Sequence, residues 1–160
     1  MTIKEGDQMP VGTLTLITKD GPQKVSSTDY FKGKKVVLFS VPGAFTPTCD
    51  AKHLPGFVER AADFKTKGVA TIACMAVNDA FVMKAWGKAQ NCDGKVDMLA
   101  DGNGEYTKLL GLELDATGYG MGKRGQRFAV VVDNGVVKKL NVEAGGEFKV
   151  SSADYVLEQL

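Results

Sequence analysis

Hydrophobic residues in this chain fall in short runs separated by polar, glycine-rich segments. Two runs, KKVVLFSV (34–41) and VATIACMAV (69–77), are nearly continuous and rich in β-branched residues. This pattern is typical of central strands that are buried on both faces of a sheet. A third apolar stretch, RFAVVVDNGVVKKLNVE (127–143), is interrupted by Asn134-Gly135, the strongest short signal for a β-hairpin. The sequence therefore predicts a sheet that is antiparallel in part.

Helical spacing of apolar residues occurs between and after these strands. In the first helical segment, positions three and four residues apart form one buried face: Leu54, Phe57, Val58, Ala61 and Phe64. We expect helices over about residues 49–67, 79–90, 104–110 and 152–160. Because strands alternate with helices and a hairpin follows, we predict an α/β sandwich of the thioredoxin type, with a mixed central sheet flanked by helices. There is no internal repeat or linker, so a single domain over residues 1–160 is expected.

The charge of the chain is balanced, with 20 Lys+Arg against 19 Asp+Glu and a net charge of +1. This balance argues against nucleic acid or an anionic membrane as a partner. No apolar run approaches the roughly 20 residues that cross a bilayer, and MTIKEGDQMP lacks the pattern of a signal peptide. We therefore expect a cytoplasmic protein, or an organellar one whose transit peptide has been removed.

The three cysteines, Cys49, Cys74 and Cys92, are odd in number and have no CxxC spacing. This usage favours a reducing compartment in which the thiols are either reactive or buried. The chain has one histidine and no cysteine pair at metal-ligand spacing, which argues against a zinc site.

One cysteine stands in an unusually restricted segment, VPGAFTPTCDAKHLPGF (41–57). Thr46 is a good N-cap, and Pro47 then occupies the first helical position. Cys49 becomes the third helical residue, close to the Thr46 hydroxyl that accepts an N–H of the first turn. Free N–H groups at a helix start favour an anion such as a thiolate, whereas the neighbouring Asp50 opposes one. We therefore expect a cation from elsewhere in the chain to face Cys49.

The eight residues PGAFTPTC match the pattern Pro-x-x-x-Thr-x-x-Cys of peroxiredoxins, which are cysteine peroxidases on a thioredoxin-like fold. The segments HLPGFVE, VNDAFVMKAWG, LADGNGEYTK, LGLELD and RFAVVVDNGVVKKLNVE extend the resemblance over almost the whole chain, to the type II, or peroxiredoxin-5-like, subfamily. The resemblance implies that Cys49 is the peroxidatic cysteine and that Thr46 bonds the thiolate and the peroxide. It further implies that Pro42 shields the site from water and that Arg127 supplies the cation facing the thiolate.

The same resemblance implies reduction of hydrogen peroxide and organic hydroperoxides through a cysteine sulfenic acid, without a metal, flavin or haem, in a homodimer. Some members carry a resolving cysteine where this chain has Ser151 and Ser152, so we expect a one-cysteine cycle with glutathione and glutaredoxin. Two alternatives stay open. One is a thioredoxin-linked cycle in which Cys74 resolves the sulfenic acid, and the other is a peroxide sensor that passes its oxidation to a partner. A thiol-disulfide oxidoreductase would need a CxxC motif, which is absent.

His53 lies four residues after Cys49, a spacing that would place both on one helical face. A Cys-His pair suggests a cysteine hydrolase, but such enzymes usually draw their histidine from a distant part of the chain. A base role for His53 is therefore disfavoured. Pro55 is expected to kink the helix near Ala51, because it removes one backbone donor.

Three further segments bear on function less directly. Cys92 stands between two polar stretches and is expected to be an exposed loop thiol. GMGKRG (120–125) fits a nucleotide-binding glycine pattern, but a strand follows it, so we interpret it as a mobile basic loop. DGNGEY begins like a calcium loop, yet Tyr106 stands where glycine is required, which argues against calcium.

Overall fold

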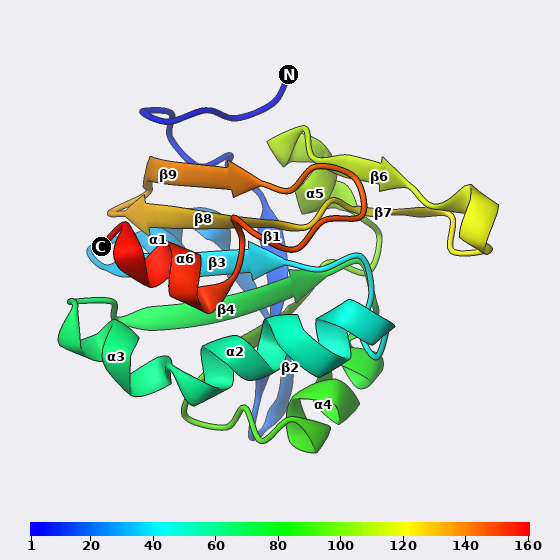
Figure 1. Ribbon diagram of the computed structural model, residues 1–160, viewed down its shortest axis with the longest axis horizontal. Coiled ribbons are helices and arrows are strands. Elements are labelled where there is room, and N and C mark those ends of the chain that lie inside the picture. The colour runs from blue at the N-terminus through cyan, green and yellow to red at the C-terminus, as the bar shows by residue number, and fades with distance from the viewer.

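A seven-stranded mixed sheet forms the centre of the molecule (Figure 1). The structure is a computed structural model that describes residues 1–160. The strand order is β2-β1-β5-β4-β3-β8-β9, in which β3, β4 and β5 run parallel and every other pair is antiparallel. The strands are β1 (Thr13–Thr18), β2 (Gly21–Ser26), β3 (Lys35–Ser40), β4 (Thr71–Ala76), β5 (Asp97–Ala100), β8 (Phe128–Asp133) and β9 (Val136–Val142), with β6 (Glu113–Asp115) and β7 (Lys123–Gly125) forming a separate hairpin. The predicted mixed α/β fold is confirmed.

The two nearly continuous apolar runs form the adjacent central strands β3 and β4, as predicted. Their side chains alternate between two hydrophobic clusters, one on each face of the sheet. In β3, Phe39 belongs to one cluster and Leu38 to the other, and both side chains are completely buried. Burial on both faces explains why these strands are apolar at nearly every position.

The predicted hairpin joins β8 to β9 through Asn134-Gly135. Both turn residues have positive φ, 48° and 80°, as a two-residue turn of type I′ requires. A register shift between Val131 and Val132 adds a β-bulge to the pair.

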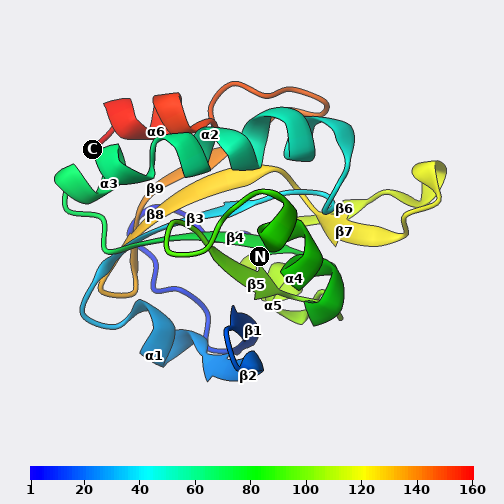
Figure 2. The same cartoon turned by 90° about the horizontal axis from the view of Figure 1, so that it is seen from below.

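Helices cover both faces of the sheet, and Figure 2 shows α2, α3 and α6 along one side with α1 on the opposite side. The first face carries a cluster that includes Phe57 of α2 and Trp86 of α4, and the second face buries Tyr106 of α5. The helices are α1 (Ser27–Phe31), α2 (Leu54–Glu59), α3 (Ala61–Thr66), α4 (Ala80–Ala89), α5 (Glu105–Leu110) and α6 (Ala153–Glu158). The helices expected over 79–90, 104–110 and 152–160 are thus present. No helix in the structure has the length and apolar character that a membrane crossing requires.

The expected continuous helix over residues 49–67 is wrong in detail. A π-helix, η1, spans Cys49–His53, and α2 follows directly. The helix is interrupted at Arg60, which lies between α2 and α3. The N–H of Leu54 donates to the Cys49 carbonyl, five residues back, at the place where Pro55 offers no N–H. The irregularity that Pro55 predicted is therefore a widened turn over Cys49–His53.

Two other expectations need correction. Residues 120–125 are not simply a loop, because Lys123–Gly125 form β7 and pair with Glu113–Asp115 after the short 3-10 turn η2 (Thr117–Tyr119). The sequence patterns also gave no prediction of the β1–β2 hairpin or of the four-residue strand β5.

Candidate active site

The register of the sheet brings three distant segments together at one end. Ser40, the last residue of β3, pairs with Phe128, and Phe128 pairs with Val142 at the end of β9. Arg127 precedes Phe128 and Glu143 follows Val142, so both lie beside the loop that leaves β3. The Glu143 N–H donates to the Arg127 carbonyl at 3.0 Å, which fixes the two residues against each other.

The loop after β3 has a strained but well-supported backbone. Phe45 adopts a left-handed conformation with φ 63°, which is unfavourable for a bulky side chain. The N–H of Ala44 donates to the Asn78 side chain at 2.9 Å, and the N–H of Val41 donates to the Met75 carbonyl at 3.2 Å. Met75 in β4 and Asn78 just after it thus hold the loop in the path that leads to Cys49.

Cys49 is fully buried at the start of the π-helix, and Arg127 faces it. The Arg127 Nη2 donates to the Cys49 Sγ over 3.1 Å. A guanidinium carries a positive charge and can only donate hydrogen bonds, so the sulfur is the acceptor in this contact. The structure thus brings together the thiol and a cation that lie 78 positions apart in the sequence.

Thr46 lies directly before the helical turn that begins at Pro47, but its hydroxyl does not accept from that turn. It donates instead to the Gly43 carbonyl at 2.7 Å, while the Thr46 carbonyl accepts the Asp50 N–H at 2.9 Å. The expected capping bond between the hydroxyl and the first turn is therefore wrong. The bond to Gly43 turns the hydroxyl proton back into the loop and leaves the oxygen lone pairs free.

Asp50, which the sequence placed next to the thiol, is engaged elsewhere. One carboxylate oxygen accepts from the Trp86 indole N–H at 2.8 Å and from the Gln90 amide at 2.9 Å. Both partners belong to α4 or its C-cap. The two hydrogen bonds join the Cys49 segment to α4 and direct this carboxylate oxygen toward that helix.

His53 contacts Arg127 and not Cys49. Its Nδ1 lies 2.8 Å from the Arg127 Nη1, and its Nε2 lies 2.9 Å from the Ser151 carbonyl oxygen. Burial and the nearby Arg127 charge lower the pKa of His53 to about 3, so the ring is neutral at physiological pH. Because Nδ1 accepts from Arg127 and Nε2 carries the proton, neither nitrogen is free to act as a base toward Cys49.

Pro42 lines a cavity of about 220 Å³ that also borders Arg127, Thr48 and the Glu143–Gly146 segment. Arg127 therefore contacts both this cavity and the cysteine sulfur. Arg124 of β7 donates to the Met121 carbonyl at 2.9 Å and, through a longer hydrogen bond of 3.5 Å, to the Pro42 carbonyl. The cavity borders the site at Pro42 and Arg127, whereas Cys49 is not among the residues that line it.

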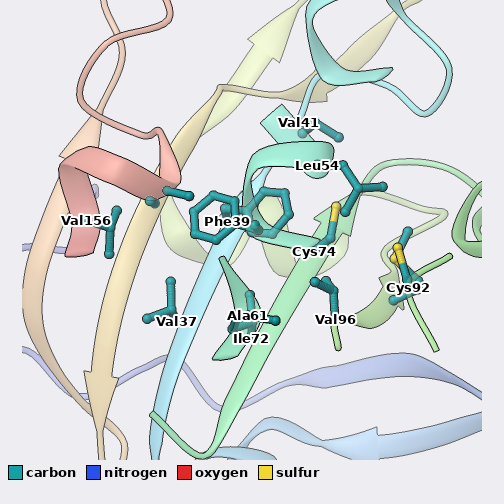
Figure 3. Close-up of a cluster of buried hydrophobic side chains, with 14 of the residues drawn as sticks. Val37, Phe39, Val41, Leu54, Ala61, Ile72, Cys74, Cys92, Val96 and Val156 are labelled. Atoms are coloured by element: carbon teal, nitrogen blue, oxygen red, sulfur yellow. The ribbon is translucent and has the colours of Figure 1, made fainter. Parts of the chain in front are cut away.

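The other two cysteines lie inside the hydrophobic cluster that also contains Cys49 (Figure 3). Cys74 is fully buried in β4, and burial raises its thiol pKa well above the usual value. The expectation that Cys92 is exposed is wrong, since it is only 2% exposed and burial raises its pKa to about 11. The N–H of Cys92 donates to the Gly87 carbonyl, which draws the residue in beneath the end of α4.

Sequence reasoning missed several residues that surround the site. The side chain of Phe148 packs against His53, with ring centroids 5.1 Å apart, and lies 5.9 Å from the Arg127 guanidinium carbon. Glu143 accepts hydrogen bonds from Ser151, whose carbonyl contacts His53. The only sequence signal for Glu143 was its position as the last residue of the predicted hairpin.

Comparisons with known proteins agree with this geometry. The chain matches the Redoxin family over residues 4–157. Peroxiredoxin-2B of Arabidopsis thaliana is 54% identical over 159 residues, which cover 99% of this chain and 98% of that protein. The structure of reduced Prx3 from Vibrio vulnificus in complex with H2O2 matches with a TM-score of 0.95 and 52% identity over 99% of each chain. Peroxiredoxin 5 from Alvinella pompejana matches with a TM-score of 0.86 and 36% identity, over 98% of this chain and 96% of that one. The chain therefore belongs to the redoxin family as a peroxiredoxin of the type II, peroxiredoxin-5-like subfamily, and is a thiol-dependent peroxidase.

Proposed function

We propose that this peroxidase reduces hydrogen peroxide and organic hydroperoxides through a sulfenic acid on Cys49. The observation that carries the proposal is the Arg127 guanidinium 3.1 Å from a fully buried cysteine sulfur. The similar Vibrio vulnificus protein, whose structure holds H2O2, supports peroxide as the substrate.

In the proposed reaction the Cys49 thiolate attacks one oxygen of the peroxide. The S–O bond forms as the O–O bond breaks, the bonding electron pair leaves with the second oxygen, and a proton from solvent converts that oxygen to water or an alcohol. The sulfur becomes a sulfenic acid. Arg127 stabilises the charge as it moves from sulfur to the leaving oxygen, and the Thr46 hydroxyl donates to the peroxide in place of Gly43. Pro42 forms the apolar wall that excludes water.

We propose that an external thiol regenerates the enzyme. Glutathione displaces water from the sulfenic acid to give a mixed disulfide, and glutaredoxin or a second glutathione then releases the Cys49 thiol and carries away the disulfide. The burial of Cys74 and the contact of Asp50 with α4 support this cycle over the thioredoxin-linked cycle through Cys74. A Cys49–Cys74 disulfide would require the Cys49 segment to leave α4.

The proposed assembly is a homodimer formed at the end of the sheet that carries the site. Exposed aromatic side chains occur in three elements near this end (Figure 1): Phe45 in the loop after β3, Phe81 in α4 and Tyr119 in the turn between β6 and β7. Phe81 is 78% exposed and Tyr119 is 87% exposed, and a partner that covers them would bury apolar area. We propose the cytoplasm as the location. An organelle is the alternative, because a similar Arabidopsis protein is named chloroplastic.

The test is a comparison of wild type with Cys49→Ser in assays supplied with glutathione and glutaredoxin, or with thioredoxin and its reductase. Wild type is expected to consume peroxide catalytically with the glutathione system, and Cys49→Ser is expected to show no turnover, because a serine hydroxyl is a far weaker nucleophile. Turnover that persists in Cys49→Ser would disprove the assignment of the nucleophile.

Mass spectrometry of the reaction stopped before reduction separates the cycles. A glutathione adduct on Cys49 supports the one-cysteine cycle, whereas a Cys49–Cys74 disulfide and turnover with thioredoxin alone would refute it. A protein that is oxidised by peroxide but turns over with neither reductant, and that oxidises another protein instead, would be a sensor.

A further inference from the structure

His53 is held in one tautomer by two partners, one a hydrogen-bond donor and the other an acceptor. A guanidinium only donates hydrogen bonds, so the Nδ1 that lies 2.8 Å from Arg127 must be the unprotonated nitrogen. The proton is then on Nε2, which donates to the Ser151 carbonyl at 2.9 Å. The ring is fully buried between the aromatic side chains of Phe39, Phe57 and Phe148, which leaves it no other polar partner.

The Ser151 carbonyl is itself held in place by Glu143. One Glu143 oxygen accepts three hydrogen bonds, from the Lys149 N–H at 2.7 Å, the Ser151 N–H at 2.8 Å and the Ser151 hydroxyl at 2.6 Å. Burial alone would raise the pKa of Glu143, but these hydrogen bonds outweigh it, and the pKa lies below its usual value. The carboxylate is therefore ionised and bonded at neutral pH.

A neutral acceptor beside Arg127 has an electrostatic consequence. A carboxylate in the place of His53 would pair with the guanidinium and offset its charge at the cysteine sulfur. The unprotonated Nδ1 fixes the direction of Nη1 and leaves the positive charge in place. Since the guanidinium is planar, fixing Nη1 also directs Nη2 toward Cys49.

We propose that Glu143 and Ser151 are positioning residues of the peroxidase, which hold His53 in its Nε2-protonated tautomer and thereby direct the Arg127 guanidinium at Cys49. The inference rests on the proposed roles of Cys49 and Arg127. It assigns a function to the 143–151 segment, which connects β9 to α6 and contributes no group that contacts the sulfur.

The first measurement is the second-order rate constant for oxidation of Cys49 by hydrogen peroxide in a single turnover, followed by rapid quenching and mass spectrometry. No reductant is present, so the result does not depend on the regeneration cycle. Glu143→Gln is expected to lower this constant about tenfold, within the range that misplacement of a catalytic group costs. Asp154→Asn removes one negative charge from an exposed residue nearby and is expected to keep the wild-type constant.

The second measurement compares two substitutions of His53. Asn places its amide oxygen near the position of Nδ1 and keeps an acceptor for Arg127, whereas Gln places its amide near Nε2 and leaves Arg127 without one. We expect His53→Asn to retain a larger rate constant than His53→Gln, with the latter reduced about tenfold to a hundredfold. These variants also provide the test if Glu143→Gln does not fold.

The third measurement is the nitrogen NMR spectrum of the imidazole, which is unambiguous because the chain has one histidine. Wild type is expected to show a protonated Nε2 and an unprotonated Nδ1, and Glu143→Gln a mixture of tautomers. A Glu143→Gln variant with the wild-type rate constant would overturn the proposal. A reduced rate constant with an unchanged tautomer would also overturn it, because Glu143 would then act by its charge. A wild-type Cys49 that does not react with peroxide would refute the proposed function and the inference with it, whereas a reactive wild type with an equally reactive Glu143→Gln would refute the inference alone.

Discussion

Acidification provides a direct test of the neutral, buried state of His53. Its folded pKa of about 3 lies below the ordinary value of 6.5, so the folded chain binds a proton less readily than the unfolded chain does. Histidine titration therefore leaves the free energy of unfolding unchanged above about pH 6.5 and lowers it progressively as the pH falls from 6.5 toward 3. From pH 7 to pH 5, the unfolded histidine takes up most of a proton and His53 almost none, which lowers the free energy of unfolding by about 2 kcal/mol.

The assay is urea unfolding at pH 5, 6 and 7, at fixed protein concentration and ionic strength. Two proteins are compared, Cys49→Ser and the double variant Cys49→Ser/His53→Asn, so that titration of the Cys49 thiol contributes to neither. Carboxylates titrate in both proteins and their effect cancels in the difference. The free energy of unfolding of the double variant is expected to fall by about 2 kcal/mol less between pH 7 and pH 5 than that of Cys49→Ser.

Two pH profiles that run parallel to within about 0.5 kcal/mol would refute the reasoning, because a histidine that is protonated equally in both states contributes no pH dependence. That result would mean that His53 accepts a proton in the folded protein despite Arg127. The single tautomer inferred from its two contacts would then be wrong as well.

Three other predictions address the oxidation of Cys49, the need for a resolving cysteine and the dimeric assembly. Arg127→Ala is expected to slow Cys49 oxidation by about a hundredfold or more, as loss of a transition-state donor does, and an unchanged rate constant in single-turnover kinetics would show that the cation is misassigned. The Cys74→Ala/Cys92→Ala variant is expected to keep most of its turnover with glutathione and glutaredoxin while it loses about 1 kcal/mol of stability for each small cavity; lost turnover would instead support resolution by a second cysteine. Phe81→Asp is expected to convert the dimer to a monomer in light scattering at micromolar concentration, and a wild type that is already monomeric would contradict the proposed assembly.

The sequence was most informative where local rules act alone. Asn134-Gly135 specified a two-residue turn with positive φ, and the continuous apolar runs specified β3 and β4, because a strand buried on both faces has few polar positions. Pro55 correctly indicated an irregular helix, although its form, a π-helix over Cys49–His53, depends on how the backbone satisfies the carbonyl groups that lack a partner.

The environment of the site was less predictable because it depends on contacts between distant segments. Cys92 stands among polar residues, yet packing beneath α4 buries it. Thr46 has the residue type of a cap, but a nearer carbonyl in its own loop accepts its proton. The contacts of His53 with Arg127 and Ser151 join positions 74 and 98 residues apart, and no local pattern marks them.

The hydrogen bond between Trp86 and Asp50 gives the molecule an intrinsic optical reporter. The chain has a single tryptophan, and its indole N–H donates to Asp50, the residue that follows Cys49. Unwinding of the Cys49 segment would break this bond and hydrate a ring that is otherwise fully buried. Such hydration shifts indole emission to longer wavelength, so the fluorescence of the unlabelled protein distinguishes oxidation within the folded site from oxidation that opens it.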